Sequence, residues 1–282
     1  MKVRYARYAG SFYAGTRESL RRQIEECFMH RFGPGSIPSL REAGERKIIG
    51  LVCPHAGYMY SGPIAANAYY KLALDGRVDT FIILGPNHQG IGSGVALMDR
   101  GVWRTPLGDV EIDGEVAKEI LKYSTIIDVD DLAHAYEHSI EVQLPFLQYI
   151  CGQSFKFIPI CFLMQDLETA REVGRALSEA LKNKNALIIA SSDWTHYEPQ
   201  RVAYEKDSEA INAVLKLDEK LFYSVLESRH VTACGYGPIA ALITAAKGLG
   251  ARSSELLRYK TSGDVTGDTS AVVGYAAISI TR

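Results

Sequence analysis

Short apolar runs that each end in a polar loop are the dominant pattern of this chain. Three of them are continuous and strand-sized, at residues 48–52, 80–84 and 186–190. A run of four to eight apolar residues that stops at Pro, Gly or Ser is typical of a strand buried on both faces. The runs alternate with amphipathic segments of helical period, and this alternation predicts an α/β fold with a largely parallel sheet.

Helix caps and hydrophobic periodicity predict the helices. A helix is expected over residues 17–31 after Thr16, whose side chain can accept a hydrogen bond from a free backbone amide of the first turn. Gly62 and Pro63 fit the N-cap and first position of another helix, which ends near Gly76. The remaining helices are predicted at residues 113–122, 166–182, 202–215, 219–226 and from 237 onward.

Two features indicate a mixed sheet in place of a purely parallel one. Residues 95–113 alternate between apolar and polar positions around Asp99, which predicts a β-hairpin. Two further strands, at residues 254–261 and 270–280, close the chain. Because no linker is long or polar enough to divide it, residues 1–282 are predicted to form one layered α/β domain with a mixed, partly parallel central sheet flanked by helices.

Composition narrows the class of protein. The formal net charge of −2 and the absence of a long basic block argue against nucleic acid or an anionic membrane as a partner. No apolar run is long enough to span a bilayer, and the first residues lack the apolar core of a secretion signal. The five cysteines are scattered without a CxxC pair, so we expect a reducing, cytoplasmic location. Cys27, Cys53, Cys151 and Cys161 are expected to be small buried hydrophobes.

A histidine follows each of the three buried runs: His55, His88 and His196. In open α/β sheets, ligands bind in the crevice beyond the carboxyl ends of the strands. If the three strands are neighbours, the three imidazoles converge there. Neutral imidazole is the commonest metal ligand in proteins, and converging imidazoles suit zinc, iron or copper.

Other polar residues near these histidines have alternative interpretations. Asp193 could bind the metal, orient a histidine as a supporting carboxylate, or cap a helix. Glu137 and His138 could supply a proton donor or a substrate contact, or they could cap the following helix. Cys234 lies just before a helix N-terminus, where positive partial charge is expected to lower the pKa of a thiol. The resulting thiolate would be either a soft metal ligand or a nucleophile served by His196.

Several short motifs together resemble the Memo family. They are Ala-Gly-Ser-Phe-Tyr at 9–13, Pro-His-Ala-Gly-Tyr at 54–58, Gly-Pro-Asn-His at 85–88, Glu-His-Ser-Ile-Glu at 137–141, Ser-Ser-Asp-Trp-Thr-His at 191–196 and Thr-Ala-Cys-Gly at 232–235. The resemblance extends from about residue 5 to the final strand. It implies a fold like that of the class III extradiol dioxygenases, which are non-haem iron enzymes that open catechol rings.

The resemblance also implies roles for particular residues. By position in the motifs, His55 and His88 would bind the metal, His196 would be the acid/base residue, and Cys234 would stand near the third ligand position. Tyr13, Tyr58, Glu137 and His138 are assigned to substrate binding and Asp193 to the catalytic group. The dioxygenases use a glutamate as third ligand, so a thiolate there changes redox potential and metal preference. Ring opening is therefore implied by analogy of fold alone.

The family resemblance further implies partners. The eukaryotic member resembles a signalling adaptor that binds phosphotyrosine peptides and copper or iron. Prokaryotic members are associated with a radical SAM protein and a small partner protein. For this chain we expect a small-molecule or peptide substrate and no nucleic-acid or membrane partner.

Three functions are compatible with the sequence. The first is a redox metalloprotein that binds Fe(II) or Cu, with Zn as a further fit, through His55, His88 and Cys234. The second is a catalytically inactive module that binds a peptide or ligand in the same pocket. The third is a metal-free hydrolase with Cys234 as nucleophile, His196 as base and Asp193 orienting it. Metal content and the reactivity of Cys234 distinguish the three.

Overall fold

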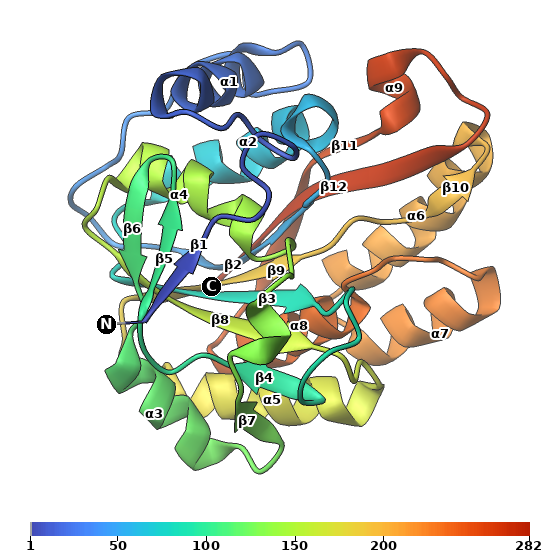
Figure 1. Ribbon diagram of the computed structural model, residues 1–282. Helices are drawn as coiled ribbons and strands as arrows, with labels where there is room; N and C mark the ends of the chain where they lie inside the picture. Colours follow the sequence, from blue (N-terminus) through green and yellow to red (C-terminus); the bar gives the residue numbers. More distant parts are fainter. Residues whose placement is uncertain (1) are drawn as a thin grey trace.

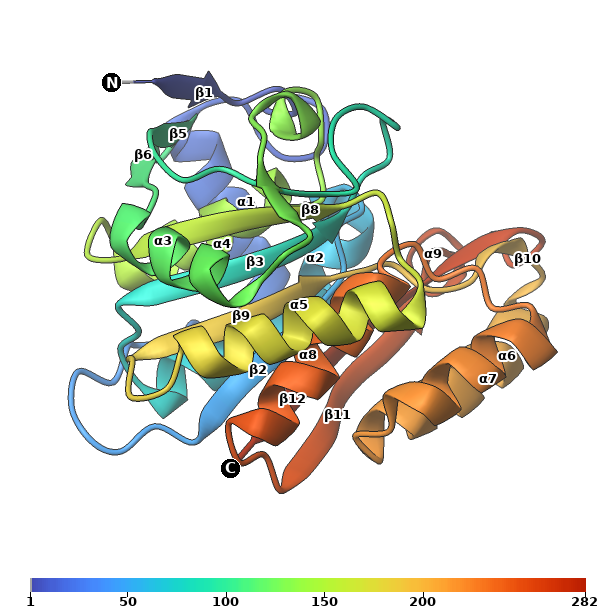
Figure 2. The same cartoon turned by 90° about the horizontal axis from the view of Figure 1, so that it is seen from below.

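The structure is a computed structural model that describes residues 2–282, and a nine-stranded mixed sheet between two layers of helices is its central feature (Figures 1 and 2). Four parallel strands form the middle in the order β2-β9-β3-β8. Their bounds are Ile48–Cys53 for β2, Thr80–Pro86 for β3, Lys156–Phe162 for β8 and Ala186–Ser191 for β9. The predicted fold class is therefore confirmed.

Antiparallel strands extend this centre on both sides. Next to β2 runs β12 (Val272–Thr281), which also pairs with β11 (Ser253–Thr261) and β10 (His196–Glu198). Next to β8 runs the short β4 (Val95–Leu97), followed by β7 (Ile127–Val129) at the edge. The parallel strands thus lie inside the sheet, where both faces are covered.

Alternation along the inner strands produces two separate cores. In β2, Ile48 and Leu51 pack on one face, whereas Ile49 and Val52 pack on the other. The apolar runs are continuous because both sides of the sheet are buried. The cysteines at 27, 53, 151 and 161 belong to these buried regions, as predicted.

Different elements cover the two faces (Figure 2). One face carries α1 (Arg17–Met29), α2 (Tyr58–Asp75), α4 (Leu144–Cys151) and a small sheet of β1 (Val3–Tyr5), β5 (Val102–Thr105) and β6 (Gly108–Glu111). The other carries α3 (Gly114–Tyr123), α5 (Leu167–Ala180), α6 (Gln200–Leu215), α7 (Glu219–Arg229) and α8 (Tyr236–Gly248). Short helices complete the list, namely η1 (Leu132–His134), η2 (Glu141–Gln143) and α9 (Ser262–Thr266). Within residues 2–282, no helix is both long and apolar enough to cross a bilayer.

The predicted cap at Thr16 is confirmed, and two local predictions are wrong. Thr16, Asp113 and Asp166 each accept a backbone amide at the start of their helix. The predicted hairpin over 95–113 is instead three strands in two sheets, because β4 joins the large sheet while β5 pairs with β1 and β6. Gly101 connects them at a φ of 110°, in the region that favours glycine.

Helix α2 begins at Tyr58 and not at Gly62, with Gly57 as its N-cap. Pro63 therefore lies inside the helix, where it has no amide to donate to the carbonyl of Met59. The side chain of Met59 is 66% exposed. The missing bond falls near the start of the helix, which continues to Asp75.

Candidate metal centre

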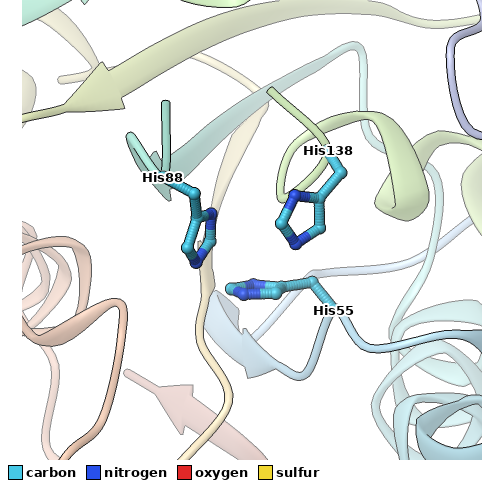
Figure 3. A group of neighbouring side chains, drawn as sticks. All are labelled: His55, His88 and His138. Carbon is cyan, nitrogen blue, oxygen red and sulfur yellow. The ribbon is translucent and has the colours of Figure 1, made fainter. Parts of the chain in front are cut away.

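Two of the three strand-end histidines lie at the carboxyl edge of the sheet, where the ends of β2, β9 and β3 are neighbours. His55 follows the end of β2 by two residues, and His88 follows β3 by the same interval. A third imidazole, His138, comes from the loop between η1 and η2. Figure 3 shows the three rings turned toward one another.

The three rings are close enough to share one ion. One nitrogen of each lies within 4.8 Å of those of the other two. The ring centroids are 5.3 Å apart for His55 and His88, 5.3 Å for His55 and His138, and 4.5 Å for His88 and His138. His55 is buried, while the His88 side chain is 30% exposed, so the group opens to solvent on the His88 side.

Glu137 fixes the His88 ring and the backbone of the His138 loop. Its carboxylate accepts the His88 Nδ1–H at 2.9 Å and the backbone amides of His88, His138 and Ser139 at 2.6–2.9 Å. Because a carboxylate only accepts, His88 must carry its proton on Nδ1, which leaves Nε2 with a free lone pair. Gly85 on β3 lets the loop of Glu137 to Ser139 lie close to the strand, since a Cβ at this position would lie 2.4 Å from Ser139 Oγ.

A buried hydroxyl determines the tautomer of His55. Ser191 Oγ donates to the carbonyl of Ser139 at 2.7 Å and accepts from Gln143 Nε2 at 2.7 Å. Its single proton is then used, so the 2.9 Å contact with His55 must be donated by His55 Nδ1. The Nε2 lone pair of His55 therefore also remains free.

Burial keeps two of these imidazoles, His55 and His138, neutral. It lowers the pKa of His55 well below its ordinary value, and the neighbouring His138 and His88 lower it further. Burial likewise lowers the pKa of His138 to about 4, against the opposing effect of Glu137. Although burial by itself would raise the pKa of Glu137, the hydrogen bond and charge of His88 bring it to about 2. Neutral rings beside a fixed carboxylate are the protonation states that metal binding requires.

The sulfur of Cys234 lies on His55, 3.1 Å from Nε2. The backbone amide of Asp193 also points at this sulfur, at 3.3 Å. The expectation that the helix N-terminus lowers the pKa of Cys234 is wrong, because burial and the Asp193 carboxylate raise it. Without a metal, Cys234 is a thiol whose proton can be donated to the free lone pair of His55.

Asp193 supports the loop that holds His55. Its Oδ1 accepts the backbone amide of His55 at 2.8 Å, and its Oδ2 lies 4.0 Å from His55 Nε2. Burial raises the pKa of this carboxyl to about 6. It caps no helix, since α6 begins after Pro199. The structure therefore places Asp193 beside His55, on the side of its Nε2, and excludes the capping interpretation.

His196 lies at the start of β10, outside the group of three. Its backbone amide donates to Thr232 Oγ1 and its Nδ1–H donates to the Thr232 carbonyl, at 2.8 and 2.9 Å. Within residues 2–282, no hydrogen bond joins His196 to Cys234 or to Asp193. The predicted Cys234–His196–Asp193 arrangement of a hydrolase thus lacks both of its internal contacts.

The N-terminal segment forms one wall of the centre, which the sequence patterns did not indicate. Phe12 and Tyr8 pack on the His138 ring, with centroid distances of 4.8 and 5.4 Å. Arg4 is buried and bonds Glu141 at 2.6 Å, and it also donates to the carbonyl of Glu137. This pairing anchors the loop of Glu137 and His138 to the start of the chain.

Tyr13 and Tyr58, which were assigned to substrate binding, support the same loop from below. Tyr13 is 1% exposed and donates to Glu141 at 2.7 Å, while Tyr58 is 3% exposed and donates to the Val142 carbonyl at 2.6 Å. Tyr13, Tyr58 and Glu141 all lie in the motifs of the sequence, but those motifs did not indicate that the three residues form one network.

Comparison with known proteins identifies the family. A family model described as "Memo-like protein" matches residues 4–279. A MEMO1 family protein of Methanopyrus kandleri is 52% identical over 276 residues, which cover 97% of each chain. The chain belongs to the Memo family. MEMO1 family proteins of Methanothermobacter thermautotrophicus and Sulfolobus acidocaldarius are each 49% identical, over 98% of this chain and 100% and 98% of their own.

A solved structure supports the fold of this Memo family chain. The crystal structure of an uncharacterized protein from Escherichia coli K12 superimposes with a TM-score of 0.53 and 12% sequence identity. The match covers 82% of this chain and 99% of that one. At this level of identity the likeness concerns the architecture alone.

The donor set of this Memo family member fits a first-row transition metal. Zinc–nitrogen bonds of about 2.1 Å at tetrahedral angles place ligand nitrogens about 3.4 Å apart. The three imidazoles lie within 4.8 Å of one another, so small side-chain movements close the set. Two of the rings have their outer nitrogen protonated and hydrogen-bonded, the arrangement typical of metal-ligating histidines.

Proposed function

We propose that this protein binds one redox-active metal ion, iron(II) or copper, through the imidazoles of His55, His88 and His138 and the sulfur of Cys234. The observation that carries the proposal is the convergence of three imidazoles on one point at the sheet edge. A thiol only 3.1 Å from His55 Nε2 adds a soft, potentially anionic donor, and nitrogen with sulfur donors favours copper, iron or zinc over magnesium or calcium.

The bound ion would supply electron transfer and activation of a coordinated oxygen atom of the substrate. The surrounding residues have separate tasks in this scheme. Glu137 and Ser191 hold the His88 and His55 rings in the tautomers that free their Nε2 lone pairs. His196 keeps Nε2 available for proton transfer, because its Nδ1–H is engaged by Thr232.

The substrate of this scheme is a small molecule or a group on a peptide. The exposed side of His88 gives access to the centre, and the rings of Phe12 and Tyr8 border His138. These rings favour an aromatic or apolar substrate, since aromatic pairs add to the burial of apolar surface.

Elemental analysis of protein purified anaerobically and without chelator tests the proposal. Wild-type protein is expected to contain close to one iron or copper ion per chain, and the double variant His55→Ala/His88→Ala almost none. His230→Asn is the matched control, because His230 is exposed at the end of α7 with a φ of 51°, which Asn also adopts. Equal metal content in wild type and double variant would refute the proposal.

Single variants resolve the remaining ligands. We expect both His138→Ala and Cys234→Ser to weaken metal affinity at least tenfold, as loss of one ligand from a set of four implies. If only Cys234→Ser loses metal affinity, the ligands are His55, His88 and Cys234, as the sequence suggested. If only His138→Ala loses metal affinity, the ligands are the three histidines. If the metal-free protein binds a peptide or small molecule tightly, the inactive binding module is favoured instead.

A further inference from the structure

A cavity apart from the candidate metal centre lies near α7 and the starts of α5 and α8. Figure 2 shows how these three helices are arranged. Its volume of about 660 Å³ is in the range of small-ligand sites. The described residues that line it include two tyrosines, two carboxylates and no Lys or Arg; they are Asp166, Tyr223, Ser224, Leu226, Glu227, Val231 and Tyr236. This composition differs from that of the metal centre, with which the cavity shares no lining residue.

The two carboxylates in this cavity lack a cationic partner. Within residues 2–282, no ion pair within 4.0 Å involves Asp166 or Glu227. Hydrogen bonds from the side chain and amide of Thr169 lower the pKa of Asp166, so that carboxylate is ionised at neutral pH. The cavity therefore has a local negative charge that no described side chain neutralises.

In a cavity at the other edge of the sheet, two carboxylates are paired with cationic side chains. It measures about 610 Å³ and is more acidic. Its Asp109 pairs with Arg104 and its Glu111 pairs with Lys156. A cation that binds Asp109 or Glu111 would have to displace an oppositely charged side chain, whereas among the described residues no cationic side chain pairs with Asp166 or Glu227.

The aromatic rings supply the second element of cation recognition. The rings of Tyr223 and Tyr236 have centroids 5.7 Å apart and planes at 79°, so they form two nearly perpendicular walls. The faces of tyrosine rings attract ammonium groups, and several such faces together recognise alkylated ammonium ions. Leu226 and Val231 add apolar surface suited to the methyl groups of such an ion.

The nearby helix starts do not oppose a cation strongly. The Asp166 side chain already accepts the amide of Thr169 at the start of α5, at 3.0 Å. The Gln165 side chain accepts the amide of Gly237 at the start of α8, at 2.9 Å. These amides are thus directed at protein atoms, and the positive ends of both helices are partly compensated.

From these observations we infer that the cavity of Tyr223, Tyr236, Asp166 and Glu227 is a binding site for an alkylammonium group. The group belongs to a free quaternary amine or to a methylated lysine side chain, which present the same chemistry. The site is independent of the proposed metal centre, although Gln165 touches both regions through its bond to the Cys234 carbonyl at 3.0 Å.

Calorimetric titration of the full chain with choline tests the site. The control ligand is 3,3-dimethylbutan-1-ol, which has the shape of choline without its charge. We expect saturable binding of choline, at least fivefold tighter than that of the neutral alcohol, because charge and aromatic faces both contribute. No saturable binding of choline up to high millimolar concentration, or equal binding of the two ligands, would overturn the inference.

Variants locate the binding. Glu227→Gln and Tyr236→Leu are each expected to weaken choline binding at least threefold, whereas Tyr236→Phe retains the ring and is expected to bind normally. Asp128→Asn, at an exposed strand position on β7, is the control for loss of a carboxylate. Unchanged binding by Glu227→Gln and Tyr236→Leu would contradict the assignment. Tyr223 is left intact because its hydroxyl donates to Gln165.

Two further titrations separate the sources and the sites. Acetyl-trimethyllysine amide tests the side-chain source, and tighter binding of either this compound or choline supports the inference and identifies the group. The His55→Ala/His88→Ala protein should bind choline as wild type does. Loss of choline binding in that variant would place the ammonium group at the metal centre and refute a separate site.

Discussion

The polar side chains near the two ends of the parallel strands differ in whether their polar atoms are bonded to a partner. At the amino ends, Asp109 and Glu111 line a cavity but are bonded to Arg104 and Lys156. At the carboxyl ends, His55 and His88 use only their Nδ1 atoms for support and leave Nε2 free. Charged side chains that line a cavity are thus a poor sign of function when they are paired with one another. Converging imidazoles whose Nε2 atoms take no part in supporting the fold are a better sign.

The ion pairs at the two ends also differ in how far their side chains are buried. Arg4 and Glu141 hold the His138 loop with side chains that are 7% and 1% exposed, whereas Arg104 and Asp109 are 47% and 35% exposed. Removing one partner of a buried pair leaves an uncompensated charge, while an exposed partner is replaced by water.

The largest effect is expected from breaking the buried pair. Glu141→Gln should lower the free energy of unfolding by about 3–5 kcal/mol, because the Arg4 guanidinium stays buried without a carboxylate. Urea denaturation followed by circular dichroism measures this loss. Asp109→Asn serves as control and should leave the midpoint essentially unchanged. Equal effects of the two substitutions would show that burial does not distinguish the two ends.

A smaller effect is expected from His134, which lies beneath the same loop. Burial, with the Arg4 charge, lowers the pKa of His134 to about 4. The unfolded chain binds a proton below about pH 6.5 while the folded protein does not until about pH 4, so stability is lost as the pH falls through this window. One such group contributes a slope of about 1.4 kcal/mol per pH unit.

The variant His134→Gln isolates this slope. Its amide can replace the 3.2 Å contact of His134 Nε2 with the Ala96 carbonyl but does not titrate. The buried carboxyls Asp193 and Asp207, whose pKa values are raised by burial to about 6, act in the opposite direction in both proteins. Urea denaturation between pH 4 and 6.5 should show a shallower loss of stability in the variant, and parallel curves would contradict this assignment.

Local patterns were sufficient to predict the central strands and two of the three clustered histidines. His55 and His88 directly follow strands that are buried on both faces, and such strands have a clear apolar signature. Their approach then follows from the strand order β2-β9-β3. His196 also follows a buried strand, but the chain runs on from β9 to pair with β12, and the ring bonds to Thr232.

The grouping of His138 with these two rings could not be predicted from such patterns. Its loop has no regular period, and its path is set by Arg4 and Glu141, which are 137 positions apart. The small sheet could not be predicted for the same reason, since β1 pairs with β5, which is distant in the sequence. The protonation of Cys234 depends on burial and on the Asp193 carboxylate, which outweigh the helix start that the sequence reveals.

X-ray absorption spectroscopy of the zinc-loaded protein tests the central claim most directly. We expect imidazole nitrogens at about 2.0–2.1 Å and one sulfur at about 2.3 Å from the metal. The sulfur contribution should disappear in Cys234→Ser, and the imidazole pattern should disappear in His55→Ala/His88→Ala. A first shell made of oxygen atoms alone, or a spectrum unchanged by the double substitution, would contradict a metal centre at this edge of the sheet.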